Sequence, residues 1–82
     1  MKFSEKLKII RKEEGYTQKS LGEILGSSEI SIRFYEIGKS KPHYKFIEKL
    51  CKLHPEYALW LMTGKTQPPY QISPIDKNKQ GE

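Results

Sequence analysis

Hydrophobic residues recur along most of the chain at the spacing of amphipathic helices. Phe3, Leu7 and Ile10 lie at i, i+4 and i+7, on one face of a helix that a glycine ends. Thr17 and Ser28 are N-cap residues ahead of the next two apolar stripes, and a proline opens the last one. The pattern predicts helices over about residues 4–14, 17–25, 28–37, 43–53 and 55–62. Because no stretch alternates with a period of two, we expect a compact all-α fold of five helices.

The apolar positions of these helices identify the expected core, and the end of the chain has few such positions. In the second and third helices the inward residues would be Leu21, Ile24, Leu25, Ile32, Tyr35 and Ile37. From Thr66 onward the chain has three prolines, few apolar residues and no helical period. We therefore expect residues 1–65 to form the domain and residues 66–82 to form a flexible tail. The only anchors expected for this tail are Tyr70, Ile72 and Ile75.

Net charge narrows the class of partner. The 82 residues include 15 Lys and Arg against 10 Asp and Glu, a formal charge of +5, which indicates a polyanion such as nucleic acid or anionic lipid. The surplus lies in residues 1–16 and 39–52, whereas residues 17–38 carry two bases against three acids. No segment sets lysines opposite aromatic residues as a membrane-surface helix does, and no apolar run approaches the ~20 residues that span a bilayer. We therefore expect nucleic acid as the partner and no membrane association.

Two of the predicted helices, over about 17–25 and 28–37, are separated by only a Gly-Ser turn. A linker this short holds the helices at a steep angle, which is the geometry of a helix-turn-helix motif. The positions that fix the register of this segment are Leu7, Arg11, Gly15, Tyr16, Thr17, Gln18, Leu21, Gly22, Leu25, Gly26, Ser28, Ile32, Tyr35, Glu36, Gly38, Lys39 and Pro42. In these residues and their spacing, about residues 4–54 resemble the Cro/phage-repressor-type helix-turn-helix family, often called Xre-like. One departure is Gly22, where the family usually has alanine.

The resemblance implies double-stranded DNA as the partner, with the second helix of the motif in the major groove. It places four side chains where members of the family contact base edges: Glu29, Ile30, Arg33 and Phe34. Arg33 suits a bidentate contact to guanine, Ile30 a thymine methyl and Glu29 the N4 of cytosine. Two alternatives stay open, because Glu29 also suits the positive end of the helix dipole and Phe34 could fold back into the core.

The resemblance also implies phosphate contacts from the helix N-termini at Thr17, Gln18 and Ser28, and the loop after the recognition helix offers further candidates. The candidates are Thr17, Gln18, Ser28, Lys39, Lys41, Lys45 and Tyr44. For the lysines the alternative is a solvated side chain, and for Tyr44 it is packing. The resemblance further implies that Arg11 and Glu36 form a structural ion pair between the first helix and the end of the recognition helix.

The fifth predicted helix is apolar on nearly all sides, and it gives an expectation about self-association. Tyr57, Trp60 and Leu61 share one face, while Leu59 and Met62 face elsewhere. A helix of this kind must be buried on more than one side. We therefore expect a homodimer with this helix at or near its seam and Tyr57, Trp60 and Leu61 as candidates for the contact, which would set two recognition helices about one DNA turn (roughly 34 Å) apart. The alternative is that Trp60 fills the core of the single chain.

No pattern in the sequence indicates catalysis. His43 and His54 lack partners at the spacing of a zinc site, and no histidine lies where it would activate Cys51, so we expect no enzyme activity, cofactor, metal or small-molecule ligand. The resemblance implies a transcriptional regulator of the bacterial cytoplasm, of the phage or prophage repressor or Cro type, that binds a pseudo-palindromic operator as a homodimer. The alternative is an antitoxin that binds a toxin through residues 66–82 and autoregulates its operon.

Overall fold

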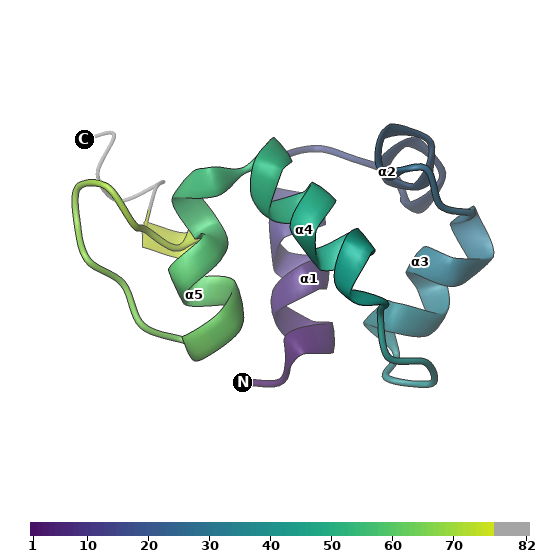
Figure 1. Cartoon of the computed structure of the whole chain (residues 1–82), viewed down its shortest axis with the longest axis horizontal. Coiled ribbons are helices and arrows are strands. Elements are labelled where there is room, and N and C mark those ends of the chain that lie inside the picture. The colour runs from purple at the N-terminus through teal and green to yellow at the C-terminus, as the bar shows by residue number, and fades with distance from the viewer. Residues whose placement is uncertain (77–82) are drawn as a thin grey trace.

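The helices begin and end close to the predicted boundaries. A computed structural model describes residues 1–76. Its helices are α1 (Phe3–Glu13), α2 (Gln18–Leu25), α3 (Glu29–Glu36), α4 (Tyr44–Leu53), the 3-10 turn η1 (Pro55–Tyr57) and α5 (Ala58–Thr63). α1 and α4 lie in the middle of the molecule, with α2 and α3 on one side and η1 and α5 on the other (Figure 1). The expected helical fold is confirmed, with the difference that the fifth predicted helix begins as a 3-10 turn.

Two glycines let α2 and α3 meet at a short turn. Gly26 follows α2 in the left-handed region, with φ of 68°, which an L side chain rarely adopts. Gly22 lies inside α2, where a Cβ would be only 2.9 Å from the carbonyl oxygen of Ser27. Glycine in a helix costs about 1 kcal/mol relative to alanine. Here it gives the turn between α2 and α3 the room to approach α2.

The hydrophobic core draws on every helix and on η1. Its buried members are Leu7, Ile10, Leu21, Leu25, Ile32, Phe46, Leu50, Tyr57, Trp60 and Leu61. α2 packs against α3 and α4, while α1 packs against α3 and α5. Burial of this kind supplies the main driving force for folding, and it fixes the helix-turn-helix unit on α1 and α4.

Two isoleucines that we expected in the core are exposed instead, and the prediction for them is wrong. Ile24 and Ile37 lie at the surface. The inward face of α2 runs through Leu21, Leu25 and the buried Gly22, so the 100° step of the helix turns Ile24 toward solvent. Ile37 is the C-cap of α3, and beyond the last helical residue the helical spacing no longer fixes the direction of a side chain.

The face of the fifth predicted helix that we assigned to a dimer seam belongs to the core of the single chain. Tyr57, Trp60 and Leu61 are at most 6% exposed, and the Nζ of Lys6 on α1 donates to the Trp60 carbonyl at 3.3 Å. The expectation that these three side chains lie at a seam is wrong, because α1 and α4 already cover them. The alternative, in which Trp60 fills the core, holds.

Tyr57 predicts how stability changes at alkaline pH. Its hydroxyl donates to Glu14. Burial, and to a lesser extent this carboxylate, raises the pKa of Tyr57 above the ordinary value of about 10. The folded chain therefore holds the phenolic proton more tightly than the unfolded chain. The resulting stability is complete below pH ~10 and is lost as the pH rises through the folded-state pKa. Urea titrations between pH 8 and 11 measure the free energy of unfolding of the unaltered chain and of a Tyr57→Phe variant. The difference between the two should shrink above about pH 10. A difference that stays constant with pH would contradict this assignment.

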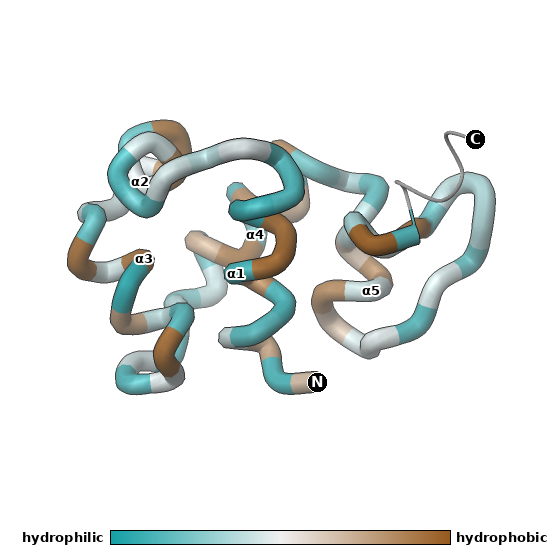
Figure 2. The backbone as a smooth tube through the Cα atoms, turned by 180° about the vertical axis from the view of Figure 1, so that it is seen from behind, coloured by the Kyte–Doolittle hydropathy of each residue, from teal (hydrophilic) through white to brown (hydrophobic). Residues whose placement is uncertain are grey.

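The segment after α5 turns back onto the domain. Gln67 and Gln71 exchange two backbone hydrogen bonds of 2.7 and 3.0 Å. The Gln71 side chain then spans η1 and α5, because its Nε2 donates to the Pro55 carbonyl at 3.0 Å and its Oε1 accepts from Leu59 N–H at 2.9 Å. In Figure 2 a hydrophobic stretch of this segment lies beside η1 and α5. The described part of the predicted tail therefore differs from the flexible segment we expected.

Only one of the three expected anchors of this segment packs on the core. Ile72 does so, and its N–H donates to the Glu56 carbonyl at 2.9 Å, whereas Tyr70 is 83% exposed and Ile75 is also exposed. Residues 77–82 of the predicted tail lie outside the described residues. The division of the chain at residue 65 stays a prediction. Within residues 1–76, no helix has the length and apolar content to cross a membrane.

Candidate nucleic-acid interface

The outer face of α3 carries the side chains that the sequence assigned to base reading. Glu29, Ile30 and Arg33 are exposed, and Phe34 is half-buried. Helical spacing sets residues i, i+1, i+4 and i+5 on one side, so the four side chains form a single strip along the helix. The strip combines a carboxylate, an aliphatic group and a guanidinium, which together can accept from, pack against and donate to base edges.

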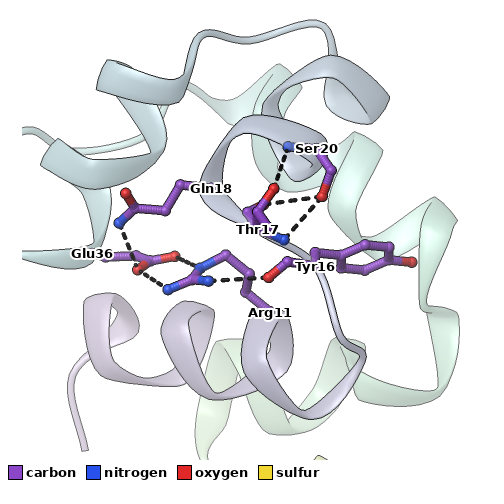
Figure 3. Close-up of polar contacts among 6 residues, drawn as sticks. All are labelled: Arg11, Tyr16, Thr17, Gln18, Ser20 and Glu36. Atoms are coloured by element: carbon purple, nitrogen blue, oxygen red, sulfur yellow. Dashed lines mark hydrogen bonds and ion pairs between the residues drawn. The ribbon is translucent and has the colours of Figure 1, made fainter.

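The N-termini of α2 and α3 are capped in a way that orders their first turns. The hydroxyl of Thr17 accepts from Ser20 N–H at 3.0 Å, and the Ser20 hydroxyl accepts from Thr17 N–H at 2.9 Å (Figure 3). Ser28 caps α3 by accepting from Ser31 N–H at 3.0 Å. Thr17 and Ser28 themselves are exposed. Because the first N–H groups of a helix have no partner within it, both termini suit the binding of an anion.

A buried ion pair joins α1 to the end of α3. Arg11 donates from Nε to Glu36 Oε2 at 2.6 Å and from a terminal nitrogen to Glu36 Oε1 at 3.0 Å (Figure 3). Its other terminal nitrogen donates to the Tyr16 carbonyl at 3.0 Å. The two side chains are 11% and 2% exposed. The pair that the resemblance implied is therefore present, and it holds α3 in one orientation relative to α1.

Gln18 is drawn into the same network. Its Nε2 donates to Glu36 Oε1 at 3.3 Å, so this carboxylate accepts from both α1 and the first residue of α2. A side-chain amide carries two N–H groups. The bond to Glu36 therefore orients the amide and leaves one donor for a phosphate, which keeps Gln18 a candidate for that contact.

The remaining phosphate candidates lie in the loop after α3 and in the first turn of α4. Lys39, Lys41, Tyr44 and Lys45 are all exposed. The ammonium of Lys39 lies over the ring of Phe34, 4.5 Å from its centroid. Lys39 and Lys41 thus follow the end of α3 that is opposite Ser28, and Tyr44 and Lys45 are the first two residues of α4.

Lys49 is a residue of this region that the sequence did not single out. Its Nζ donates to the Leu25 carbonyl at 3.4 Å and lies 3.1 Å from where a Cβ on Gly26 would be. A cation at the last carbonyls of α2 complements the negative end of the helix. Lys49 therefore supports the turn from α4, and only the three-dimensional contact reveals it because the two residues are far apart in the sequence.

The titratable groups elsewhere do not assemble into a metal site. Across residues 1–76, no group of three or more His, Cys, Asp and Glu side chains could hold a metal ion. Burial raises the pKa of the Cys51 thiol, which disfavours the reactive thiolate. Nε2 of His54 is 3.0 Å from the Tyr16 hydroxyl, and its Nδ1 is 3.6 Å from a carboxylate oxygen of Glu56, so this histidine ties η1 to the start of α2.

Comparison with known proteins finds a matching family profile and similar proteins. A family profile described as helix-turn-helix matches residues 7–60. The chain is 37% identical over 62 residues to the SPbeta prophage-derived uncharacterized HTH-type transcriptional regulator YonR of Bacillus subtilis (strain 168), covering 76% of this chain and 57% of that protein. It is 30% identical over 75 residues to Repressor protein C of Escherichia phage P2, covering 88% of this chain and 76% of the phage protein.

A solved structure has the same fold. It is the P22 c2 repressor protein in complex with synthetic operator 9T in the presence of Tl+, with a TM-score of 0.70 and 23% identity over 79% of this chain and 98% of that chain. With a family profile across most of the chain and these relatives, the chain belongs to the Xre-like helix-turn-helix family.

Proposed function

We propose that this chain is a sequence-specific double-stranded DNA-binding transcriptional regulator of the phage or prophage repressor or Cro type. The observation that carries the proposal is the exposed strip of Glu29, Ile30 and Arg33 on α3, between a capped helix N-terminus and a lysine-bearing loop. A helix of this kind fits the major groove, with base-reading groups on its outer face and phosphate-binding groups at its ends. The relatives named as a transcriptional regulator and a repressor support the same function.

The distribution of charge supports selective binding. Residues 17–38, which hold both helices of the motif, carry two bases against three acids, whereas residues 39–52 carry five bases against one acid. Contacts to phosphates position a protein on DNA and contacts to bases specify the sequence. A recognition unit with a net charge of −1 gains little from non-specific attraction to DNA, so its affinity depends on the bases it meets.

In this proposal the protein acts as a homodimer on a pseudo-palindromic operator in the bacterial cytoplasm, without cofactor or enzymatic activity. The seam would lie away from the buried face of η1 and α5. Met62, Tyr70 and Ile75 are exposed apolar side chains at that end of the chain, and they replace Tyr57, Trp60 and Leu61 as candidates. The antitoxin alternative assigns a partner to a segment whose described part packs on η1 and α5, and no observation favours it.

Selection of bound sites from a random pool of duplex DNA, at a stated salt concentration, tests the proposal. We expect one enriched motif composed of two inverted half-sites about one helical turn apart, since two symmetry-related α3 helices would read them. Enrichment of a single half-site would contradict the homodimer. A pool that shows no enrichment would contradict sequence-specific binding.

Two alanine variants separate base reading from phosphate binding. Arg33→Ala should cost about 1–3 kcal/mol of binding free energy at particular base pairs, because a bidentate donor to guanine is removed. Lys41→Ala should weaken binding to all sequences alike. It should also reduce the slope of log affinity against log salt concentration by about one. Titrations of the selected site, single-base variants and random duplex at several salt concentrations measure both effects. Equal losses for the two variants on random DNA would overturn the assigned roles.

A further inference from the structure

The C-terminal end of α3 has a defined backbone motif. Gly38 adopts a left-handed φ of 76° after the C-cap. The N–H of Lys39 donates to the Phe34 carbonyl at 2.9 Å, and the N–H of Gly38 donates to the Tyr35 carbonyl at 3.4 Å. These 6→1 and 5→2 bonds are the Schellman pattern. In this pattern the residue two positions beyond the C-cap is brought back against the third residue from the end of the helix, so Lys39 is set against Phe34.

The side chains of these two residues meet as the backbone dictates. The motif is frequently accompanied by a hydrophobic contact at this place, but here a lysine occupies the outer position. Its Nζ lies over the Phe34 ring, 4.5 Å from the centroid, which is within the range of a cation–π interaction. Phe34 is half-buried and lies outside the hydrophobic core cluster. Its ring therefore contacts the lysine side chain and is not part of the core.

We propose that Phe34 acts on DNA through Lys39: its ring holds the ammonium at the C-terminal end of the recognition helix, where the ammonium binds a DNA phosphate. Phe34 is then a positioning residue and not a base-reading one. A free lysine loses rotamer freedom when it binds, and a lysine already held in place loses less, which improves affinity. The inference rests on the proposed function, because it needs DNA as the ligand.

Lys41 offers a matched control, since it is an exposed lysine two residues further along the same loop. The helix dipole also attracts a cation at the end of α3, and it does so whatever side chain stands at position 34. Substitution of the ring therefore separates the two influences on Lys39. Leucine removes the π face and keeps an apolar side chain, whereas tyrosine and tryptophan keep a face.

The test is a double-mutant cycle on the selected operator and on a random duplex. Phe34→Leu should weaken binding to both about two- to five-fold, the range of an exposed cation–π interaction, and Phe34→Tyr should bind as the unaltered chain does. In a Lys39→Met background, Phe34→Leu should have no further effect. In a Lys41→Met background it should keep its full effect. The base preference of Phe34→Leu in a site selection should be unchanged.

Two sets of results would overturn the inference. One is a Phe34→Leu loss that is confined to particular base pairs and persists in the Lys39→Met background, which would make Phe34 a base-reading residue. The other comes from NMR of the unaltered chain, which needs no variant to fold. Ring currents should move the Lys39 ε-methylene protons upfield of those of Lys41, and equal shifts would mean that the ring does not hold the lysine. If the unaltered chain did not bind duplex DNA, the proposed function would be wrong, but the upfield shift of the Lys39 ε-methylene protons would remain.

Discussion

Replacing Arg11 by methionine is expected to remove about 3–5 kcal/mol from the free energy of unfolding. The substitution leaves Glu36 as a buried carboxylate, 2% exposed, without the guanidinium that now donates to both of its oxygens. A chain of this length has a total stability of about 4–12 kcal/mol at the usual 0.05–0.15 kcal/mol per residue. The loss is therefore a large part of the whole. Urea denaturation followed by circular dichroism measures it.

Two variants test the physical reason for this loss. Lys52 and Glu48 form an exposed i,i+4 pair, with side chains 75% and 58% exposed, and Lys52→Met should cost at most about 0.5 kcal/mol. The double variant Arg11→Met with Glu36→Leu should regain most of the stability, because it removes the stranded charge together with its partner. If Arg11→Met cost no more than Lys52→Met, Glu36 would have to be solvated, contrary to its burial.

The ion pair also shows which features of the candidate site were accessible from the sequence. Capping residues and the spacing of apolar side chains are local signals, so they predicted all the helices of the motif to within about a residue. The pairing of Arg11 with Glu36 is a contact across 25 residues, and no local pattern encodes it. It came from the resemblance to the family. The bond from Gln18 to the same carboxylate was not anticipated by either route.

Contacts made by polar groups account for much of what the sequence did not predict. Gln71 anchors the segment after α5 through its amide and backbone, and a glutamine gives no hydrophobic signal. Phe34 had two sequence interpretations, base reading and core packing, and the structure shows a third arrangement beneath Lys39. That arrangement depends on the left-handed Gly38, whose effect on a neighbouring side chain appears only once the backbone is known.

Replacing Trp60 by alanine is the second change with a large expected effect, a loss of about 3–5 kcal/mol in the free energy of unfolding. Trp60 is 6% exposed within one chain and belongs to the core that joins α5 to the other helices. Truncation leaves a cavity that the packed helices cannot fully close. Because the indole is buried by its own chain, the loss should be the same at low and high protein concentration. Urea denaturation over a wide range of protein concentrations measures it.

Met62 on the same helix supplies the control, because its side chain is 57% exposed. Met62→Ala should change the free energy of unfolding of the single chain by about 0.5 kcal/mol or less. If Met62 lies at the seam of a homodimer, this variant should instead lower the denaturation midpoint in a concentration-dependent way, since association stabilises the folded state by mass action. If the loss of unfolding free energy for Trp60→Ala depended on protein concentration, the buried face of α5 would have to lie at the dimer interface after all. The two variants therefore separate what holds the fold together from what joins two copies on an operator.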